Sequence, residues 1–170
     1  MNGTYVEIDG RPALHFERSL PHSAERVWRA ITDPAEIRHW FPAAVEYEQR
    51  VGAPMSFRFD DPDAPPTEGK VTELDPPRLF AFDWGGEQLR FELEPAGDGC
   101  RLLFTHFLSE RIQAARDAAG WETCLTELDR LLAGEAAEAP GIGVTPEWRA
   151  LYDKYVAAGL PSGAEVPGSD

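Results

Sequence analysis

Apolar and polar residues alternate with a period of two through much of residues 12–108, and this alternation predicts a series of β-strands. The predicted strands are Pro12–Leu20, Ala44–Glu48, Met55–Phe59, Gly69–Leu74, Leu79–Trp84, Gln88–Glu94 and Cys100–Leu108. Several are separated only by short turns, such as Gly85-Gly86, which is typical of hairpins. We therefore expect a curved antiparallel sheet of about six to seven strands, with one face in water.

Two short helices are predicted between the first and second of these strands. Ser23 is a suitable N-cap for the first, and Asp33-Pro34 is suited to begin the second. The apolar residues that these helices present are Val27, Trp28, Ile31, Ile37, Trp40 and Phe41, and Pro42 is expected to end the second helix.

After Ser109 the apolar period changes to that of a helix, predicted over Glu110–Ala133, with Gly134 as its C-terminal cap. Its apolar stripe consists of Trp121, Leu125, Leu128 and Leu132. A sheet with one long apolar face needs a cover, and this helix is the obvious one. The expected class is α+β, and the expected domain covers residues 1–134.

The remaining residues predict a linker over 135–145, an amphipathic helix over 146–159 and a disordered tail over 160–170. The appended helix carries an aromatic stripe formed by Trp148, Leu151, Tyr152, Tyr155 and Val156. This stripe has to be buried either against the domain or against a second subunit, so a homodimer through this helix is one expectation.

Composition narrows the classes of partner. A formal charge of −14 on 170 residues repels phosphate backbones, so we expect no nucleic acid as partner. No apolar run is long enough for a membrane span, and the first residues lack the pattern of a signal peptide. Two cysteines, Cys100 and Cys124, are too few for a disulfide scaffold and are expected to be buried free thiols. We therefore expect a cytoplasmic protein.

The order of these elements, together with several short motifs, resembles the START-like (SRPBCC) superfamily, the helix-grip fold of birch-pollen allergen and polyketide cyclases. Within it, the chain is similar to the branch homologous to the activator of the heat-shock-protein-ninety ATPase. The residues that carry the resemblance are Val27-Trp28, Thr32-Asp33-Pro34, Trp40-Phe41, Val51-Gly52, Gly69-Lys70-Val71, Asp75-Pro76-Pro77, Trp84, Leu102–His106, Gly120-Trp121, Leu125, Leu128 and Leu132. The chain departs from the pattern at Ala53, where a second glycine is frequent, and in the helix after Trp148, which lies outside the usual domain.

The resemblance implies a helix-grip fold with an apolar pocket between sheet and helix, and it implies no particular reaction. The residues expected to line this pocket are Trp40, Phe57, Phe59, Trp84, Phe91, Phe104, His106, Trp121 and Leu125. The competing interpretation is that these aromatic side chains simply fill the core.

His106 is the polar residue best suited to contact a ligand, since it falls on the same inward-facing side of its strand as Leu102 and Phe104. It could bind a ligand or act as a base, with Glu73 or Arg58 as candidate partners. Alternatively, it is tied to a carbonyl or carboxylate near the end of its strand.

Other candidates are weaker. His15, His22 and His39 lack a second ligand at helical spacing, and the acidic loop around Asp60 and Asp61 lacks the rest of a calcium site, so no metal and no cofactor are expected. No charged residue adjoins Cys124 to activate its thiol, and we assign no catalytic residue. Gly120 indicates a close approach to the sheet, a bend at the mouth of the pocket, or the start of the helix.

Three functional hypotheses remain. The preferred one is binding of a small hydrophobic molecule, a lipid or aromatic metabolite, in the apolar pocket. The second is a cyclase- or hydrolase-like enzyme that uses His106. The third is a co-chaperone or stress-response module that acts through its outer surface.

Overall fold

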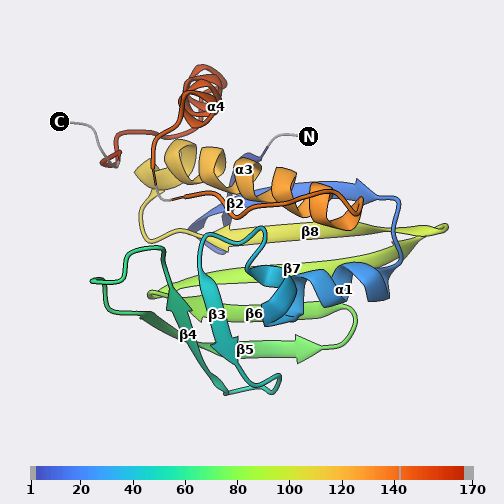
Figure 1. Ribbon diagram of the computed structural model, residues 1–170. Helices are drawn as coiled ribbons and strands as arrows, with labels where there is room; N and C mark the ends of the chain where they lie inside the picture. Colours follow the sequence, from blue (N-terminus) through green and yellow to red (C-terminus); the bar gives the residue numbers. More distant parts are fainter. Residues whose placement is uncertain (1–2, 142, 167–170) are drawn as a thin grey trace.

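A computed structural model describes residues 3–141 and 143–166 as an eight-stranded antiparallel sheet with its helices on one face (Figure 1). The strands are β1 (Thr4–Ile8), β2 (Arg11–Leu20), β3 (Ala44–Tyr47), β4 (Pro54–Arg58), β5 (Thr67–Asp75), β6 (Leu79–Trp84), β7 (Glu87–Ala96) and β8 (Gly99–Phe107). The helices are α1 (Ala24–Thr32), α2 (Pro34–Ile37), the 3-10 turn η1 (Arg111–Gln113), α3 (Ala114–Leu132) and α4 (Pro146–Ala157). The strand order is β1-β2-β8-β7-β6-β5-β4-β3, so the sheet is open. The expected α+β helix-grip class is confirmed, with one strand more than predicted.

The additional strand is β1, which pairs with β2 through the turn at Asp9-Gly10. Both turn residues have positive φ, 51° and 76°, as a tight hairpin requires. β1 is an edge strand whose side chains are exposed or half-buried on both faces, so it lacks the alternation that reveals a half-buried strand. Consequently the two short helices follow the second strand, not the first.

Local capping explains where α1 and α2 begin. The Ser23 hydroxyl accepts from the backbone N–H of Arg26 at 3.2 Å, and Asp33 accepts from that of Ala35 at 2.9 Å. The second helix is shorter than predicted and ends at Ile37. Trp40 lies beyond its end and donates its indole N–H to the carbonyl of Ala30 at 2.9 Å, which fixes the ring under α1.

The space between the sheet and its covering helices is filled by aromatic side chains. Phe91 and Phe104 stack with ring centroids 4.5 Å apart, and Trp40 meets Phe91 edge-on at 6.0 Å. Phe41 packs between Phe57, Phe82, Trp84 and Trp121. A void between these side chains has a volume of about 10 Å³, which is at the lower limit for a single water. The core of this sheet is therefore packed rather than hollow.

The segment after α3 runs back along that helix before α4 begins (Figure 1). The backbone N–H of Glu138 donates to the Glu127 side chain at 3.1 Å, which holds this return path against α3. α4 then packs on α3, and Tyr155 of its aromatic stripe is only 1% exposed. The Tyr155 hydroxyl accepts from the backbone N–H of Gly3 at 2.8 Å and also bonds the Glu122 carboxylate. The stripe thus packs against its own chain, with Trp148, Leu151 and Tyr152 half-buried and Val156 exposed.

Residues 160–165, predicted as part of a disordered tail, lie along the start of α3. Ala115 donates its N–H to the Pro161 carbonyl at 3.0 Å, and Ala164 donates to the Ile112 carbonyl at 3.3 Å. Residues 167–170 of that prediction lie outside the described part of the chain.

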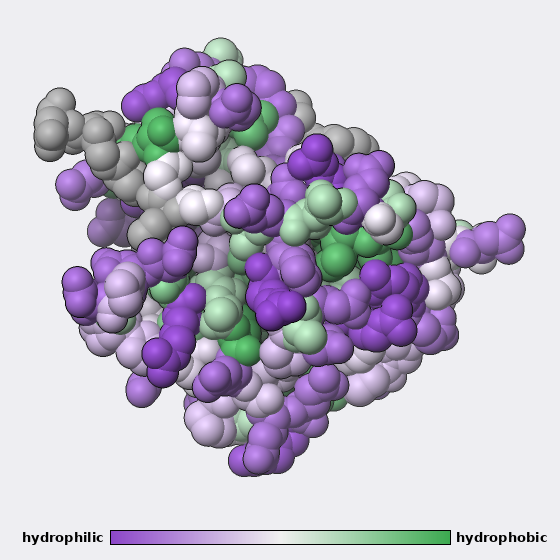
Figure 2. All heavy atoms as spheres, in the orientation of Figure 1, coloured by the Kyte–Doolittle hydropathy of each residue, from purple (hydrophilic) through white to green (hydrophobic). Residues whose placement is uncertain are grey.

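The surface is largely hydrophilic on the face seen in Figure 2, where apolar residues form separate patches among polar ones. Within the described residues, no helix is both long and apolar enough to cross a membrane.

Candidate ligand-binding cleft

A cleft of about 470 Å³ lies beside the N-terminal half of α3, at the end of the sheet where β6 turns into β7. We call it the α3 cleft. Its walls are Pro42, Phe59, Trp84, Glu87, His106, Gln113, Arg116, Asp117, Gly120, Trp121, Thr123, Cys124, Pro140, Gly141, Gly143, Val144, Thr145 and Trp148. The returning segment and the first turn of α4 therefore form one wall, and the sheet end and α3 form the others.

The structure divides the residues predicted to line a pocket into two groups. Phe59, Trp84, His106 and Trp121 line the α3 cleft. The other five, Trp40, Phe57, Phe91, Phe104 and Leu125, are at most 1% exposed and are packed in the core. The opening lies at the end of the sheet because the middle of its concave face is occupied by phenylalanine and tryptophan rings.

Sequence reasoning misses much of the polar wall and the whole contribution of the returning segment. Glu87 could have been found, because it has the same parity as the inward-facing Leu89 and Phe91. The sequence places Trp148 only in a helical stripe, and no periodicity indicates that residues 140–145 fold back along α3. Gln113, Arg116 and Asp117 lie on the first turns of the covering helix, where the apolar pattern assigns polar side chains to solvent.

His106 is completely engaged by two neighbours. Its Nδ1 lies 2.9 Å from the indole nitrogen of Trp121, and its Nε2 lies 2.9 Å from a carboxylate oxygen of Glu87. An indole N–H can only donate, so Nδ1 has to be the acceptor and carries no proton. The imidazole is therefore neutral, with its single proton on Nε2 and donated to Glu87. At 1% exposure, this arrangement leaves no free ring nitrogen.

Glu87 is the centre of this polar network. Besides His106, its carboxylate accepts the backbone N–H and the hydroxyl of Ser109, both at 3.1 Å, and the Gln113 amide at 3.4 Å. Burial alone would raise the pKa of Glu87, but the hydrogen bonds from His106 and Ser109 lower it overall. Glu87 is therefore an ionised carboxylate surrounded by donors that join β7, β8 and the start of α3.

The partners predicted for His106 were wrong. Glu73 forms an ion pair with Arg90, and Arg58 lies at the end of β4 with its side chain exposed. The observed partner is Glu87 because β7 pairs with β8 in the register Leu89↔His106, which sets Glu87 diagonally beside the imidazole. Of the two interpretations of His106, the histidine tied to a carboxylate describes this geometry.

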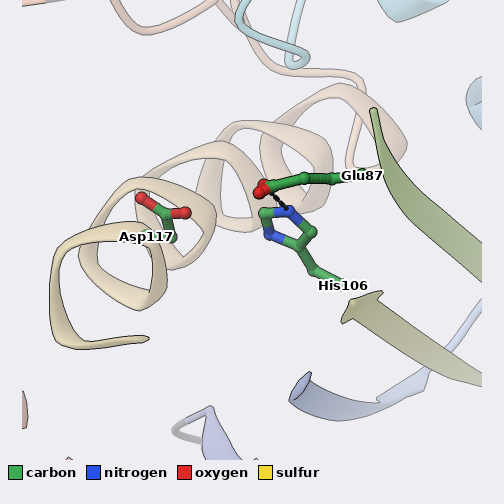
Figure 3. A group of neighbouring side chains, drawn as sticks. All are labelled: Glu87, His106 and Asp117. Carbon is green, nitrogen blue, oxygen red and sulfur yellow. Dashed lines mark hydrogen bonds and ion pairs between the residues drawn. The ribbon is translucent and has the colours of Figure 1, made fainter. Parts of the chain in front are cut away.

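Glu87, His106 and Asp117 form the group among the described residues that has the composition of a metal site, with one ligand atom from each within 4.8 Å of the others (Figure 3). The tautomer argues against that use. A metal at Nε2 would displace the proton held there, and Nδ1 would have to take one up while facing the N–H of Trp121. The group is better suited to hydrogen-bond donors than to a cation that needs the imidazole lone pair.

Cys124 and Gly120 also face the cleft from α3. Both cysteines of the chain are free and buried, and burial raises the pKa of the Cys124 thiol far above its ordinary value. Gly120 lies within α3, so it marks neither the start of the helix nor a close approach to the sheet. A Cβ at this position would have Trp148 Nε1 as its nearest neighbour, at 4.0 Å.

Comparison with known families gives a match to the family described as "Activator of Hsp90 ATPase homolog 1-like protein" over residues 21–133, more than half of the chain. No curated protein matches the sequence.

Several solved structures share the fold. CalU16 from Micromonospora echinospora superposes with a TM-score of 0.70 at 21% identity, over 92% of each chain. The protein encoded by gene BPP1335 of Bordetella parapertussis has a TM-score of 0.65 at 28% identity, over 96% of this chain and 95% of its own. The Aha1 dimer from Colwellia psychrerythraea has a TM-score of 0.59 at 21% identity, over 71% of this chain and 95% of its own.

Proposed function

We propose that this chain, which belongs to the Activator of Hsp90 ATPase homolog 1-like family, binds a small, largely apolar molecule in the α3 cleft. The single observation that carries the proposal is the cleft itself. At about 470 Å³ it lies within the usual range of small-molecule sites, whereas the core void of about 10 Å³ admits at most one water.

The walls of the cleft fit an aromatic or aliphatic body. Three of the chain's five tryptophans, Trp84, Trp121 and Trp148, face it together with Phe59. Each square ångström of apolar surface that leaves water contributes about 25 cal/mol, so a ligand held among these rings would gain most of its binding energy from burial.

The enzyme hypothesis receives no comparable support. A general base needs a free lone pair within reach of a substrate proton, and both nitrogens of His106 are occupied by Trp121 and Glu87. We therefore propose a binding protein that uses the network as a rigid wall.

A homodimer remains a proposal, supported by the Aha1 dimer of Colwellia psychrerythraea. An interface through α4 would use only the outer side of that helix, where Val156 is 40% exposed, because Tyr155 is buried against α3.

The test uses the five indole N–H signals in a ¹⁵N-correlated NMR spectrum, titrated with isobutylbenzene as a neutral aromatic probe. We expect the signals of Trp84, Trp121 and Trp148 to move, while those of Trp28 and Trp40, which do not line the cleft, stay in place. Native mass spectrometry of the same sample reports any co-purified molecule and the number of subunits. Shifts confined to Trp40, or no shift up to the solubility limit of the probe, would overturn the proposal.

A further inference from the structure

The polar wall of the α3 cleft carries more negative than positive charge. The charged residues that line it are Glu87, Asp117 and Arg116, and the neutral tautomer of His106 adds nothing. Arg116 neutralises one of the two carboxylates, because its Nε donates to Asp117 Oδ1 at 2.7 Å. One uncompensated negative charge therefore remains within the cleft.

That charge is placed where a donor could reach two carboxylates at once. An oxygen of Asp117 lies within 4.8 Å of one of Glu87, and Figure 3 shows Glu87 bonded to the His106 ring with Asp117 to one side of it. Asp117 Oδ2 accepts no hydrogen bond from the described residues. A charge-assisted N–H···O bond spans about 2.8 Å, so one ammonium nitrogen can lie between oxygens separated by up to roughly 5.6 Å.

The opposite walls suit the rest of such a molecule. Trp84, Trp121 and Trp148 present aromatic rings, and the faces of these rings attract cations as well as apolar groups. A metal ion is disfavoured at the same position because it needs the lone pair of His106 Nε2, which carries a proton. An ammonium group needs only acceptors.

We propose that the α3 cleft selects lipophilic amines, molecules with an aromatic-sized apolar body and one protonated nitrogen directed at Asp117 and Glu87. The inference rests on the proposed binding function and specifies the class of its ligand. It also predicts that carboxylate-bearing molecules such as fatty acids are rejected, since they would add a second uncompensated negative charge.

The test compares three probes of nearly the same shape, N,N-dimethylbenzylammonium, isobutylbenzene and phenylacetate, by the same indole N–H titration. We expect the ammonium to bind at least about tenfold more tightly than isobutylbenzene, and phenylacetate to bind most weakly. The preference of the cation should fall in high salt, since part of it is electrostatic.

Two variants with opposite expected effects make the test specific. Asp117→Asn removes the carboxylate and is expected to bring the affinity for the ammonium down to within about threefold of that for isobutylbenzene. Arg116→Gln removes the guanidinium that pairs with Asp117, and it is expected to tighten ammonium binding by about threefold. Both variants are expected to change the affinity for the ammonium more than that for isobutylbenzene. A purely structural role for the Arg116–Asp117 pair would make both variants weaken all probes together.

The outcomes separate the class of ligand from the binding function itself. Isobutylbenzene bound in the cleft as tightly as the ammonium, or phenylacetate bound best, would overturn the amine inference and leave the binding function intact. Failure of both ionic probes at about 10 mM, and of isobutylbenzene at its solubility limit, would overturn the binding function.

Discussion

The two ends of the same aromatic wall behave differently in this molecule. In the core, Phe91 and Phe104 are stacked and Trp40 is fixed by a hydrogen bond to Ala30, so almost no space remains. At the end of the sheet, Phe59, Trp84 and Trp121 have the same chemistry but face a cleft that only the returning segment and α4 cover. Aromatic residues at the inward-facing positions of a strand therefore do not identify a pocket, because the side chains that pack opposite them decide whether space remains.

The largest contrast should come from the same substitution made in each region. Phe104→Ala removes a ring with 0% exposure and is expected to lower the free energy of unfolding by about 3–5 kcal/mol. Phe59→Ala removes a partly exposed ring and should cost about 1 kcal/mol while weakening binding of N,N-dimethylbenzylammonium several-fold. Urea denaturation and the indole titration measure both quantities for each variant. Equal losses of stability would show that the cleft wall is an ordinary part of the core.

The next largest effect concerns the polar network that closes the cleft. Glu87→Gln removes a half-buried charge that accepts from His106, Ser109 and Gln113, and we expect a loss of about 2–3 kcal/mol at pH 7. Because folding lowers the pKa of Glu87, its ionised form contributes stability above the ordinary glutamate range. This contribution is lost as the pH falls through the lowered value.

The difference between wild type and Glu87→Gln should therefore shrink below about pH 4, as followed by urea denaturation at several pH values. Glu73→Gln is the matched control. Glu73 pairs with Arg90 on the outer face of the sheet and is 41% exposed, so its loss should cost less than about 1 kcal/mol. A Glu87 effect that does not change with pH would mean that its charge is irrelevant.

His106 shows which features of the site can be predicted from the sequence and which cannot. Its inward direction follows from strand parity, and so does the overall class of antiparallel sheet and covering helix. Its partner does not follow, because that depends on the register between β7 and β8, which brings Glu87 and not Glu73 to the imidazole. The position of Trp148 at the cleft is equally hidden, since it depends on the path of a linker without periodicity.

A smaller loss of stability is expected when the tautomer of His106 is tested, on which the argument against a metal site depends. The ¹⁵N shifts of the wild-type imidazole should show Nδ1 unprotonated and Nε2 protonated, as the Trp121 donor requires. Trp121→Phe removes that donor and should cost about 1–2 kcal/mol, as measured by urea denaturation. The variant should also bind Zn²⁺ more tightly than wild type in calorimetry, because Nδ1 can then hold the proton and free Nε2. Zinc bound by wild type through His106 would contradict the assignment.

The smallest expected change concerns Gly120, where the stability of the helix and the room for a ligand in the cleft should respond in opposite directions. Gly120 lies within α3 and faces the cleft, and a Cβ at this position would have no neighbour nearer than Trp148 Nε1, at 4.0 Å. Gly120→Ala should therefore stabilise the fold by about 0.5–1 kcal/mol, because alanine favours the helix and restricts the unfolded chain. The same methyl group narrows the cleft, so the affinity for N,N-dimethylbenzylammonium should fall by about two- to threefold in the indole titration. A more stable protein that binds more weakly would explain a glycine in the middle of this helix as space kept for a ligand. Gains in both stability and affinity would instead show that the probe binds elsewhere.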